Sequence, residues 1–317
     1  MVSMADVFAA RRVLAGQVRR TPILRADALD AIAGCELYCK AECLQLTGSF
    51  KVRGALYRMS LLTPEERARG VVAASAGNHA LGVAYAARQL GVPATVCMPG
   101  QAVRFKVEAV RALGATVLHP GNDSTALFAR VEELQREQGL VPVAPFDDPR
   151  TVAGAGTFGA EFVEDAPPLD YLVIPASGGG LLSGTLVAAK ALSPTTQVIG
   201  VQPESCQGII LSLQAGEPVT APVPSTIADG LTARRPGAVN LEVIRALADA
   251  VVAIPDAPIR RAMGLIARHL KLVVEGAGAA ALALVLSDER FAGKRVGIAL
   301  SGGNVDPKLA AEVIAAE

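Results

Sequence analysis

Short apolar runs alternate with helical stretches along most of this chain. Each run is continuously apolar, which is typical of strands that are buried on both faces of a parallel sheet. Because these units form two series, we expect an α/β fold with two open, twisted, mostly parallel sheets and helices on both faces of each sheet. The predicted strands are 71–75, 94–98, 115–119, 140–146, 171–175, 197–201, 250–254 and 296–300, and the predicted helices are 79–90, 104–113, 124–138, 182–192, 258–269 and 277–286.

The composition and charge exclude several classes of protein. With 317 residues, of which 51% are hydrophobic and 19% charged, the chain can bury a large core and is not a disordered protein. The 30 basic and 30 acidic residues balance, and no Lys/Arg run exceeds a pair, so we expect neither nucleic acid nor a membrane as a partner. The N-terminus lacks the apolar segment of a signal peptide, and the most apolar helix candidate, 277–286, is too short to cross a bilayer. We therefore expect a cytoplasmic protein.

The cysteines and histidines form no recognisable metal motif. An odd number of cysteines, without a Cys-x-x-Cys pair or a secretory signal, indicates free thiols in a reducing compartment. The three histidines lie too far apart in the sequence to form a local metal-binding motif. The residues concerned are Cys35, Cys39, Cys43, Cys97, Cys206, His79, His119 and His269.

One lysine, Lys51, lies between two glycines and has the apolar neighbours Phe50 and Val52 instead of acidic ones. Burial would disfavour the charged form of its amine and lower its pKa. A neutral amine is a nucleophile that can form a Schiff base with an aldehyde cofactor. Read alone, the stretch Thr47-Gly48-Ser49-Phe50-Lys51-Val52-Arg53-Gly54-Ala55 also fits an ordinary lysine whose stem packs on the surface while its amine reaches water.

A glycine-rich turn, Ser177-Gly178-Gly179-Gly180-Leu181, follows a predicted strand and precedes a predicted helix. Glycines let the backbone come close to an anion, and the N-terminus of the helix adds a partial positive charge. These features predict a phosphate-binding turn. It has neither the Gly-Lys-Ser/Thr of a nucleotide-binding loop nor the Gly-x-Gly-x-x-Gly of a dinucleotide site, and a tight turn without a ligand is the alternative.

A second glycine-rich turn, Ser301-Gly302-Gly303-Asn304, also follows a predicted strand. Ligands of open α/β sheets bind at the carboxyl ends of strands, where the Ser301 hydroxyl would lie. A capping serine is the alternative, and for Asn304 a capping role before the helix 306–314 is the better interpretation. His79, read alone, is an early-helix or core residue rather than a catalytic base.

Together these stretches resemble one family of enzymes. Four motifs are similar in order and spacing to the fold-type-II pyridoxal-phosphate enzymes, and within them to the threonine/serine dehydratase and serine racemase group. The motifs are 47–55, Ser75-Ala76-Gly77-Asn78-His79-Ala80, 177–181 and 301–304, and the resemblance extends over residues 5–307.

The resemblance implies a fold like that of the tryptophan synthase β-subunit. We expect a large cofactor-binding domain of residues 1–69 and 147–317, and a small domain of residues 70–146. The resemblance also implies the cofactor pyridoxal 5′-phosphate, a small amino-acid substrate and a homodimer.

By position, the resemblance gives each motif a role. Lys51 would carry the cofactor as a Schiff base and, once released, would remove the Cα proton of the substrate. The other assignments are Phe50 beside the cofactor ring, Asn78 on its 3′ oxygen, the backbone N–H groups of Ser75, Ala76, Gly77, Asn78 and His79 on the substrate carboxylate, Ser177, Gly178, Gly179, Gly180 and Leu181 on the phosphate, and Ser301 at the pyridine nitrogen. A serine there can donate to a neutral nitrogen, whereas a carboxylate would keep that nitrogen protonated. The implied reaction is β-elimination of water from a 3-hydroxy amino acid such as L-threonine or L-serine, which yields a 2-oxo acid and ammonia.

Departures from the family pattern narrow this interpretation. Ala76 stands where the racemases carry a second serine, and alanine cannot transfer a proton, so we expect a dehydratase (an ammonia-lyase) rather than a racemase. Gln202 and Gly208 stand where many relatives have acidic ligands for a divalent cation, so we predict no metal at that place. Ala155 replaces an expected glutamine, and the smaller side chain suggests a bulkier substrate such as 3-hydroxyaspartate or phenylserine.

Two other functions stay open. The first is a racemase or a β-replacement enzyme of the same fold, and the second is a non-catalytic binding protein that keeps the fold. The retained Lys51 argues against the binding protein, since an inactive relative is expected to lose it. Because the chain ends shortly after the last motif, we expect simple saturation kinetics without an amino-acid inhibitor.

Overall fold

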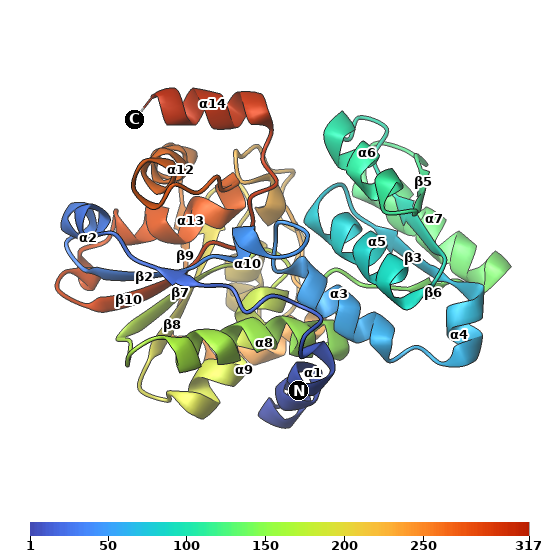
Figure 1. The fold of residues 1–317 in the computed structure, drawn as a ribbon, viewed down its shortest axis with the longest axis horizontal. Coiled ribbons are helices and arrows are strands. Elements are labelled where there is room, and N and C mark those ends of the chain that lie inside the picture. The colour runs from blue at the N-terminus through green and yellow to red at the C-terminus, as the bar shows by residue number, and fades with distance from the viewer. Residues whose placement is uncertain (317) are drawn as a thin grey trace.

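The protein contains two sheets, as the sequence predicts, and a computed structural model describes residues 1–316 (Figure 1). The strand order is β1-β2-β10-β7-β8-β9 in the larger sheet and β5-β4-β3-β6 in the smaller one. All paired strands are parallel except β1 and β2, so the predicted α/β architecture is confirmed. The strands are β1 (Ile23–Leu24), β2 (Glu36–Lys40), β3 (Val71–Ala74), β4 (Ala94–Cys97), β5 (Thr116–Leu118), β6 (Val141–Pro142), β7 (Tyr171–Pro175), β8 (Gln197–Pro203), β9 (Ala250–Ile254) and β10 (Arg295–Ala299).

Helices cover both sheets. They are α1 (Met4–Leu14), α2 (Asp27–Ala33), α3 (Lys51–Ser60), α4 (Pro64–Arg69), α5 (Asn78–Leu90), α6 (Arg104–Ala112), α7 (Ser124–Gln138), α8 (Pro149–Asp165), α9 (Gly180–Leu192), α10 (Gly208–Ala215), α11 (Ala238–Leu247), α12 (Asp256–Leu270), α13 (Gly276–Val285) and α14 (Pro307–Ala315), with short 3-10 helices η1 (Glu42–Leu44), η2 (Asp229–Leu231) and η3 (Glu289–Phe291). Among residues 1–316, no helix combines the length and the apolar character that crossing a membrane requires.

The larger sheet lies between two helical layers. Side chains of a strand alternate between faces, and those of β7 separate two cores. Leu172 and Ile174 pack with Phe158 of α8 and Leu182 of α9, whereas Val173 packs in the core that α12 and α13 form on the other face. Burial on both faces explains why β7 is continuously apolar in sequence.

The smaller sheet is covered in the same way. Val71 and Ala73 of β3 belong to a core with α5, and Val72 packs on the opposite face with Leu127 and Val131 of α7. All its strands lie between residues 71 and 142, and the strands of the larger sheet lie before and after them in the chain.

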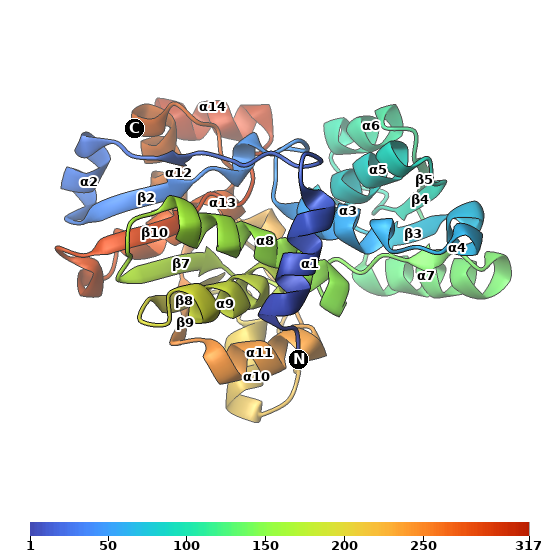
Figure 2. The same cartoon turned by 60° about the horizontal axis from the view of Figure 1, so that its bottom comes forward.

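Helix α3 connects the two halves of the molecule. Its residues Ala55, Leu56 and Met59 share one core with β3 and α5, and α1 packs against both α3 and α8 at the junction (Figure 2). A Cβ atom at Gly82 of α5 would lie 3.2 Å from the backbone of Lys51. The first turn of α3 is therefore held between the two halves.

Helix α8 is the longest element that the sequence pattern does not predict. It contains Gly154 and Gly156, which lower the propensity for a helix. These glycines let α8 approach its neighbours closely, because a Cβ atom at Gly154 would lie 2.7 Å from the carbonyl oxygen of Arg53, and one at Gly156 would lie 3.0 Å from that of Gly184. Close packing against α3 and α9 outweighs the loss of intrinsic propensity.

The predicted strand 140–146 is shorter in the structure, where only Val141–Pro142 pairs with β3. Proline has no N–H to donate, and β6 is an edge strand, which is where proline is tolerated. The residues that follow leave the sheet and carry Pro145 and Phe146 toward α3 and α9.

Candidate active site

Lys51 is the first residue of α3 and lies at the centre of the candidate site. Its amine donates a hydrogen bond to the carbonyl oxygen of Pro145 at 2.9 Å and lies 5.2 Å from the centre of the Phe50 ring. Burial lowers the pKa of Lys51 to about 8, although the nearby charge of Glu275 raises it. The amine is therefore partly shielded from water and has a substantial neutral fraction near pH 8, unlike a surface lysine.

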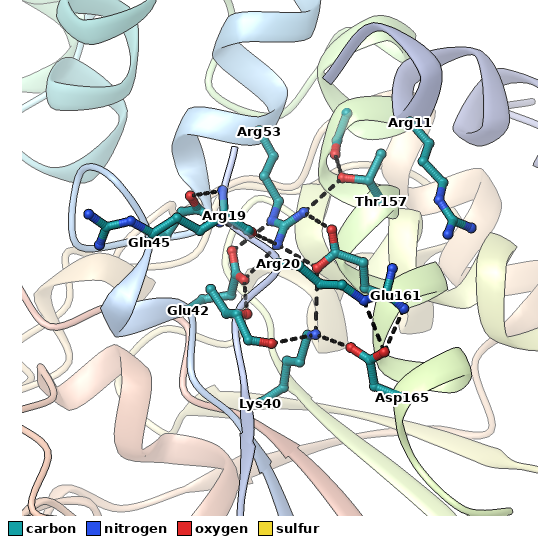
Figure 3. A network of polar contacts seen from close by, with 12 residues as sticks. Arg11, Arg19, Arg20, Lys40, Glu42, Gln45, Arg53, Thr157, Glu161 and Asp165 are labelled. Atoms are coloured by element: carbon teal, nitrogen blue, oxygen red, sulfur yellow. Dashed lines mark hydrogen bonds and ion pairs between the residues drawn. The ribbon is translucent and has the colours of Figure 1, made fainter. Parts of the chain in front are cut away.

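A buried network of charges anchors α3 two residues beyond Lys51 (Figure 3). Arg53, which is fully buried, donates two hydrogen bonds to Glu42 and two to Glu161, each at 2.8 Å. Lys40, also fully buried, donates to Asp165 at 2.8 Å. The network ties the start of α3 to the end of β2 and to α8, so it fixes the position from which Lys51 projects.

The turn 177–181 connects β7 to α9, as the sequence predicts. Gly179 has φ +99 and immediately precedes α9, whose first turn receives no side-chain cap. A Cβ atom at Gly178 would lie 2.3 Å from the ring of Phe146, so only glycine fits there. Free N–H groups at the start of a helix form a site for an anion.

The Pro145–Phe146 segment brings this turn to Lys51. Pro145 accepts the hydrogen bond from Lys51, and Phe146 packs against Gly178. The side chain of Asn240 fixes the same arrangement, because its Nδ2 donates to the carbonyl oxygens of Phe146 at 3.0 Å and Gly178 at 2.9 Å. Two motifs far apart in the sequence thus share one site.

Ser177 holds the turn in a second way. Its hydroxyl oxygen accepts a hydrogen bond from the backbone N–H of Ala233 at 3.0 Å. The hydroxyl hydrogen remains available to a ligand, since accepting does not use it.

Ser301 lies past the end of β10 and is buried. Its hydroxyl donates to the carbonyl oxygen of Ala277 over 3.4 Å, which is a long hydrogen bond. The carbonyl oxygen of Ser301 accepts from the N–H of Phe50 at 3.1 Å, and Gly302 forms an isolated bridge with Ser49. The structure thus places Ser301 beside the start of α3.

The loop 75–77 leads into α5, which begins at Asn78 and whose first turn also has no side-chain cap. Within this loop, the N–H of Ser75 donates to Cys97 O at 3.1 Å and the N–H of Gly77 donates to Ser75 Oγ at 3.2 Å. An anion at this place would therefore rely on the N–H of Ala76 and on those at the start of α5.

The ring of His79 is held by the backbone of a neighbouring segment and is not assigned to a ligand. Its Nε2 donates to the carbonyl oxygen of Val143 at 2.8 Å, because a carbonyl only accepts. Burial lowers the pKa of His79 to about 3, so the ring is neutral. It is a core residue, as its sequence context alone indicates.

Asn304 has a different role from the predicted one. The side chain that caps α14 is that of Asp306, which accepts from the N–H of Lys308 at 2.8 Å. The capping prediction for Asn304 is therefore wrong. Its Nδ2 instead donates to Thr47 O at 2.9 Å and to Asn78 Oδ1 at 2.7 Å.

The motifs in the sequence do not point to two charged residues near the site, Glu275 and Lys106. Glu275, which is buried, accepts from Asn78 Nδ2 at 2.6 Å, and burial raises its pKa to about 7. Lys106 of α6 pairs with Asp229 at 2.7 Å, and a Cβ atom at Gly77 would lie 3.9 Å from its amine. A glutamate within the apolar stretch 273–286 is the one feature that could have drawn attention to Glu275.

Gln202, at the place considered for a cation, has a different set of partners. Its Oε1 accepts from the N–H groups of Ile209 and Ile210, both at 3.2 Å, at the start of α10. Within residues 1–316, no three or more His, Cys, Asp or Glu side chains gather in a way that could hold a metal ion.

These residues fit an aldehyde cofactor that carries a phosphate. The site has a partly buried amine with a lowered pKa, a glycine turn at an uncapped helix start, and a buried serine with a long hydrogen bond. In addition, the hydroxyls of Thr47 and Ser49 are buried and make no hydrogen bond within the described part of the chain. Buried polar groups normally have partners, so a polar ligand would complete this site.

Comparison with known proteins points the same way. The family described as pyridoxal-phosphate dependent enzyme matches residues 14–302. The L-threonine ammonia-lyase of Thermotoga maritima is 42% identical over 314 residues, which cover 99% of this chain and 78% of that protein. The catabolic L-threonine dehydratase of Escherichia coli K12 is 39% identical and covers 96% of this chain and 94% of that protein.

Solved structures of similar fold include both kinds of enzyme that the motifs resemble. The structure of maize serine racemase has a TM-score of 0.94 and 35% identity, and the match covers 99% of this chain and 97% of that one. A crystal structure of the T.th. threonine deaminase has a TM-score of 0.91 and 39% identity, with 96% of this chain and 99% of that one covered.

Proposed function

Because the chain belongs to the family of pyridoxal-phosphate dependent enzymes, we propose that it is a lyase that dehydrates and deaminates a small 3-hydroxy amino acid, L-threonine or L-serine, to a 2-oxo acid and ammonia. Relatives named L-threonine ammonia-lyase and L-threonine dehydratase support this substrate class. The observation that carries the proposal is the meeting of Lys51, the turn 177–181 and Ser301 around one site.

The residues of the chain have separate tasks in this proposal. When bound, pyridoxal phosphate supplies an aldehyde for the amine and a ring that withdraws electrons from the Cα atom of the substrate. Lys51 is the amine, and with a pKa of about 8 its neutral form can accept the Cα proton. The turn 177–181 and the start of α9 would hold the phosphate. The Ser301 hydroxyl would turn from Ala277 O to donate to the pyridine nitrogen, and it lacks the negative charge that would keep this nitrogen protonated.

The substrate carboxylate would be bound at the start of α5. The N–H of Ala76 and those of the first turn of α5 supply donors, and the amine of Lys106 adds a positive charge close to Gly77. Asn78 would supply a hydrogen bond to the 3′ oxygen of the cofactor, and Phe50 would lie beside its ring.

Racemisation is the second candidate, because the fold is so close to that of maize serine racemase. A racemase must return a proton to the face of Cα opposite the lysine. Ala76, at the position where the racemase pattern has serine, carries no proton to transfer, and this favours elimination. A bulkier substrate, 3-hydroxyaspartate or phenylserine, is the finer possibility that Ala155 suggests.

The remaining expectations belong to the same proposal. We propose a homodimer with a cofactor-binding domain of residues 1–69 and 147–317 and a small domain of residues 70–146. The arrangement of strands agrees with this division, whereas α3 shares its core with α5.

An assay of 2-oxo acid release over the L and D forms of serine, threonine, 3-hydroxyaspartate and phenylserine tests this function. We expect release from L-threonine or L-serine by the holoenzyme and none by Lys51→Ala. Chiral analysis of the remaining substrate in the same reactions measures racemisation. Inversion of serine faster than 2-oxo acid release would favour the racemase, and no turnover of any substrate by a yellow holoenzyme would refute the proposed reaction.

A further inference from the structure

Asn78 is hydrogen-bonded on both sides by residues that have no task in the proposed reaction, Asn304 and Glu275. Asn304 lies in the loop after β10, Asn78 begins α5, and Glu275 immediately precedes α13. Asn304 Nδ2 donates to Asn78 Oδ1 at 2.7 Å, and Asn78 Nδ2 donates to Glu275 Oε1 at 2.6 Å. These hydrogen bonds thus join three segments that are distant in the sequence.

The direction of these hydrogen bonds is set by a backbone carbonyl. Thr47 O can only accept, so Asn304 must turn its NH2 group toward it, at 2.9 Å. The same NH2 group faces Asn78, which must therefore present its oxygen. The nitrogen of Asn78 is then turned toward the carboxyl of Glu275. If the amide of Asn78 were rotated, a donor would face the donor of Asn304 and an acceptor would face Glu275.

Glycines on both sides of these hydrogen-bonded side chains leave them just enough room. Gly48 has φ +71, and a Cβ atom there would lie 2.7 Å from Asn304 Oδ1. A Cβ atom at Gly302 would lie 2.5 Å from Glu275 Oε1 and 3.1 Å from Asn78 Nδ2. Two motif glycines are therefore needed to seat the side chains that flank Asn78.

We propose that Asn304 and Glu275 are positioning residues that hold the amide of Asn78 in one orientation and leave one of its N–H groups free to donate to the 3′ oxygen of the cofactor. The inference rests on the proposed function, because that oxygen belongs to pyridoxal phosphate. The amide nitrogen carries two hydrogens, and Glu275 accepts only one of them. A rotated amide would present an acceptor oxygen to the cofactor oxygen, and this hydrogen bond would be lost.

The first test compares two substitutions in the same loop. Asn304→Asp keeps the size of the side chain and removes both donors. Asp306→Ala removes the cap of α14 and controls for general damage to the loop. We expect Asn304→Asp to weaken the binding of pyridoxal phosphate to the apoprotein roughly ten-fold, the effect of one hydrogen bond to a charged group, and to shift the visible absorption band of the holoprotein. Asp306→Ala should leave both readouts unchanged.

The second test keeps the inference falsifiable if Asn304→Asp does not fold. Glu275→Gln retains an acceptor for Asn78, Glu275→Met does not, and both substitutions remove the charge. Only the methionine variant should weaken cofactor binding and shift the band. A purely structural role would lower stability without moving the band.

The results separate this inference from the proposed function. If the wild-type holoprotein has a visible band that Lys51→Ala abolishes, but Asn304→Asp matches the wild type in band position and dissociation constant, the inference is overturned and the function stands. Identical bands and dissociation constants for the two Glu275 variants would overturn it as well. A wild-type protein without such a band would overturn the proposed function and this inference together.

Discussion

Replacing Arg53 with methionine should remove the positive charge at the centre of the buried network in Figure 3. Methionine keeps an unbranched stem but lacks the guanidinium group, so the variant loses the positive charge and every hydrogen bond that this group donates. Four hydrogen bonds of 2.8 Å would disappear, and Glu42, which is 0% exposed, would be left without a positive partner. Glu161 would keep its ion pair with Lys40, whose amine lies 3.5 Å from the carboxylate.

Breaking a buried ion pair by removing one partner costs about 3–5 kcal/mol, because the remaining charge is desolvated and unpaired. We therefore expect the free energy of unfolding of Arg53→Met to fall by about 4 kcal/mol at pH 7. For a chain of this length, that corresponds to a melting temperature lower by roughly 6 °C.

Urea unfolding of the apoproteins at pH 7, followed by circular dichroism, measures the free energy of unfolding. Arg12→Met, at an exposed arginine of α1, is the matched control and should stay within about 0.5 kcal/mol of the wild type. An Arg53→Met protein within about 1 kcal/mol of the wild type at pH 7 would refute the reasoning.

Other predictions concern the site itself. Burial raises the pKa of Glu275 from 4.5 to about 7, so between these pH values the folded apoprotein holds a proton that the unfolded chain releases. The apoprotein should therefore lose roughly 3 kcal/mol of stability as the pH rises from 4.5 to 7. Glu275→Gln should flatten this pH dependence in urea unfolding, and an unchanged slope would contradict the assignment. Conversely, burial lowers the pKa of Lys51 from 10.5 to about 8, so stability should rise between pH 8 and 10.5, and the rise should be absent from Lys51→Met. Gly178→Ala should raise the dissociation constant of pyridoxal phosphate by at least about ten-fold, since its Cβ would overlap the ring of Phe146. Equilibrium titration of the apoprotein measures this constant, and an unchanged value would contradict the prediction. Lys106→Gln should raise KM roughly ten-fold with little change in kcat, as expected for a charge beside Gly77 that binds the substrate carboxylate; steady-state kinetics with kcat reduced alone would rule this out.

The strands were the most predictable part of the fold. Continuous apolar runs such as 171–175 have few alternatives once they alternate with helices, because helices on both sides of a parallel sheet bury both faces of its strands. Helix α8 could not be predicted in the same way. Gly154 and Gly156 weaken its local signal, and the compensation comes from α3 and α9, which are distant in the sequence.

The site was predictable where the chemistry lies within one motif. Lys51 and the turn 177–181 carry their signal locally, as an amine without acidic neighbours and a run of glycines before a helix. Glu275 and Asn304 carry no such signal, because their partner, Asn78, is brought to them by tertiary structure. Asn304 also has a plausible local role as a cap, and this role belongs to Asp306 instead.

Reduction of the yellow holoenzyme with borohydride, followed by peptide mapping, tests the central claim most directly. We predict that the pyridoxyl label is found on Lys51 and on no other lysine. A fully active enzyme whose label lies on a different residue, or that carries no label at all, would contradict the account.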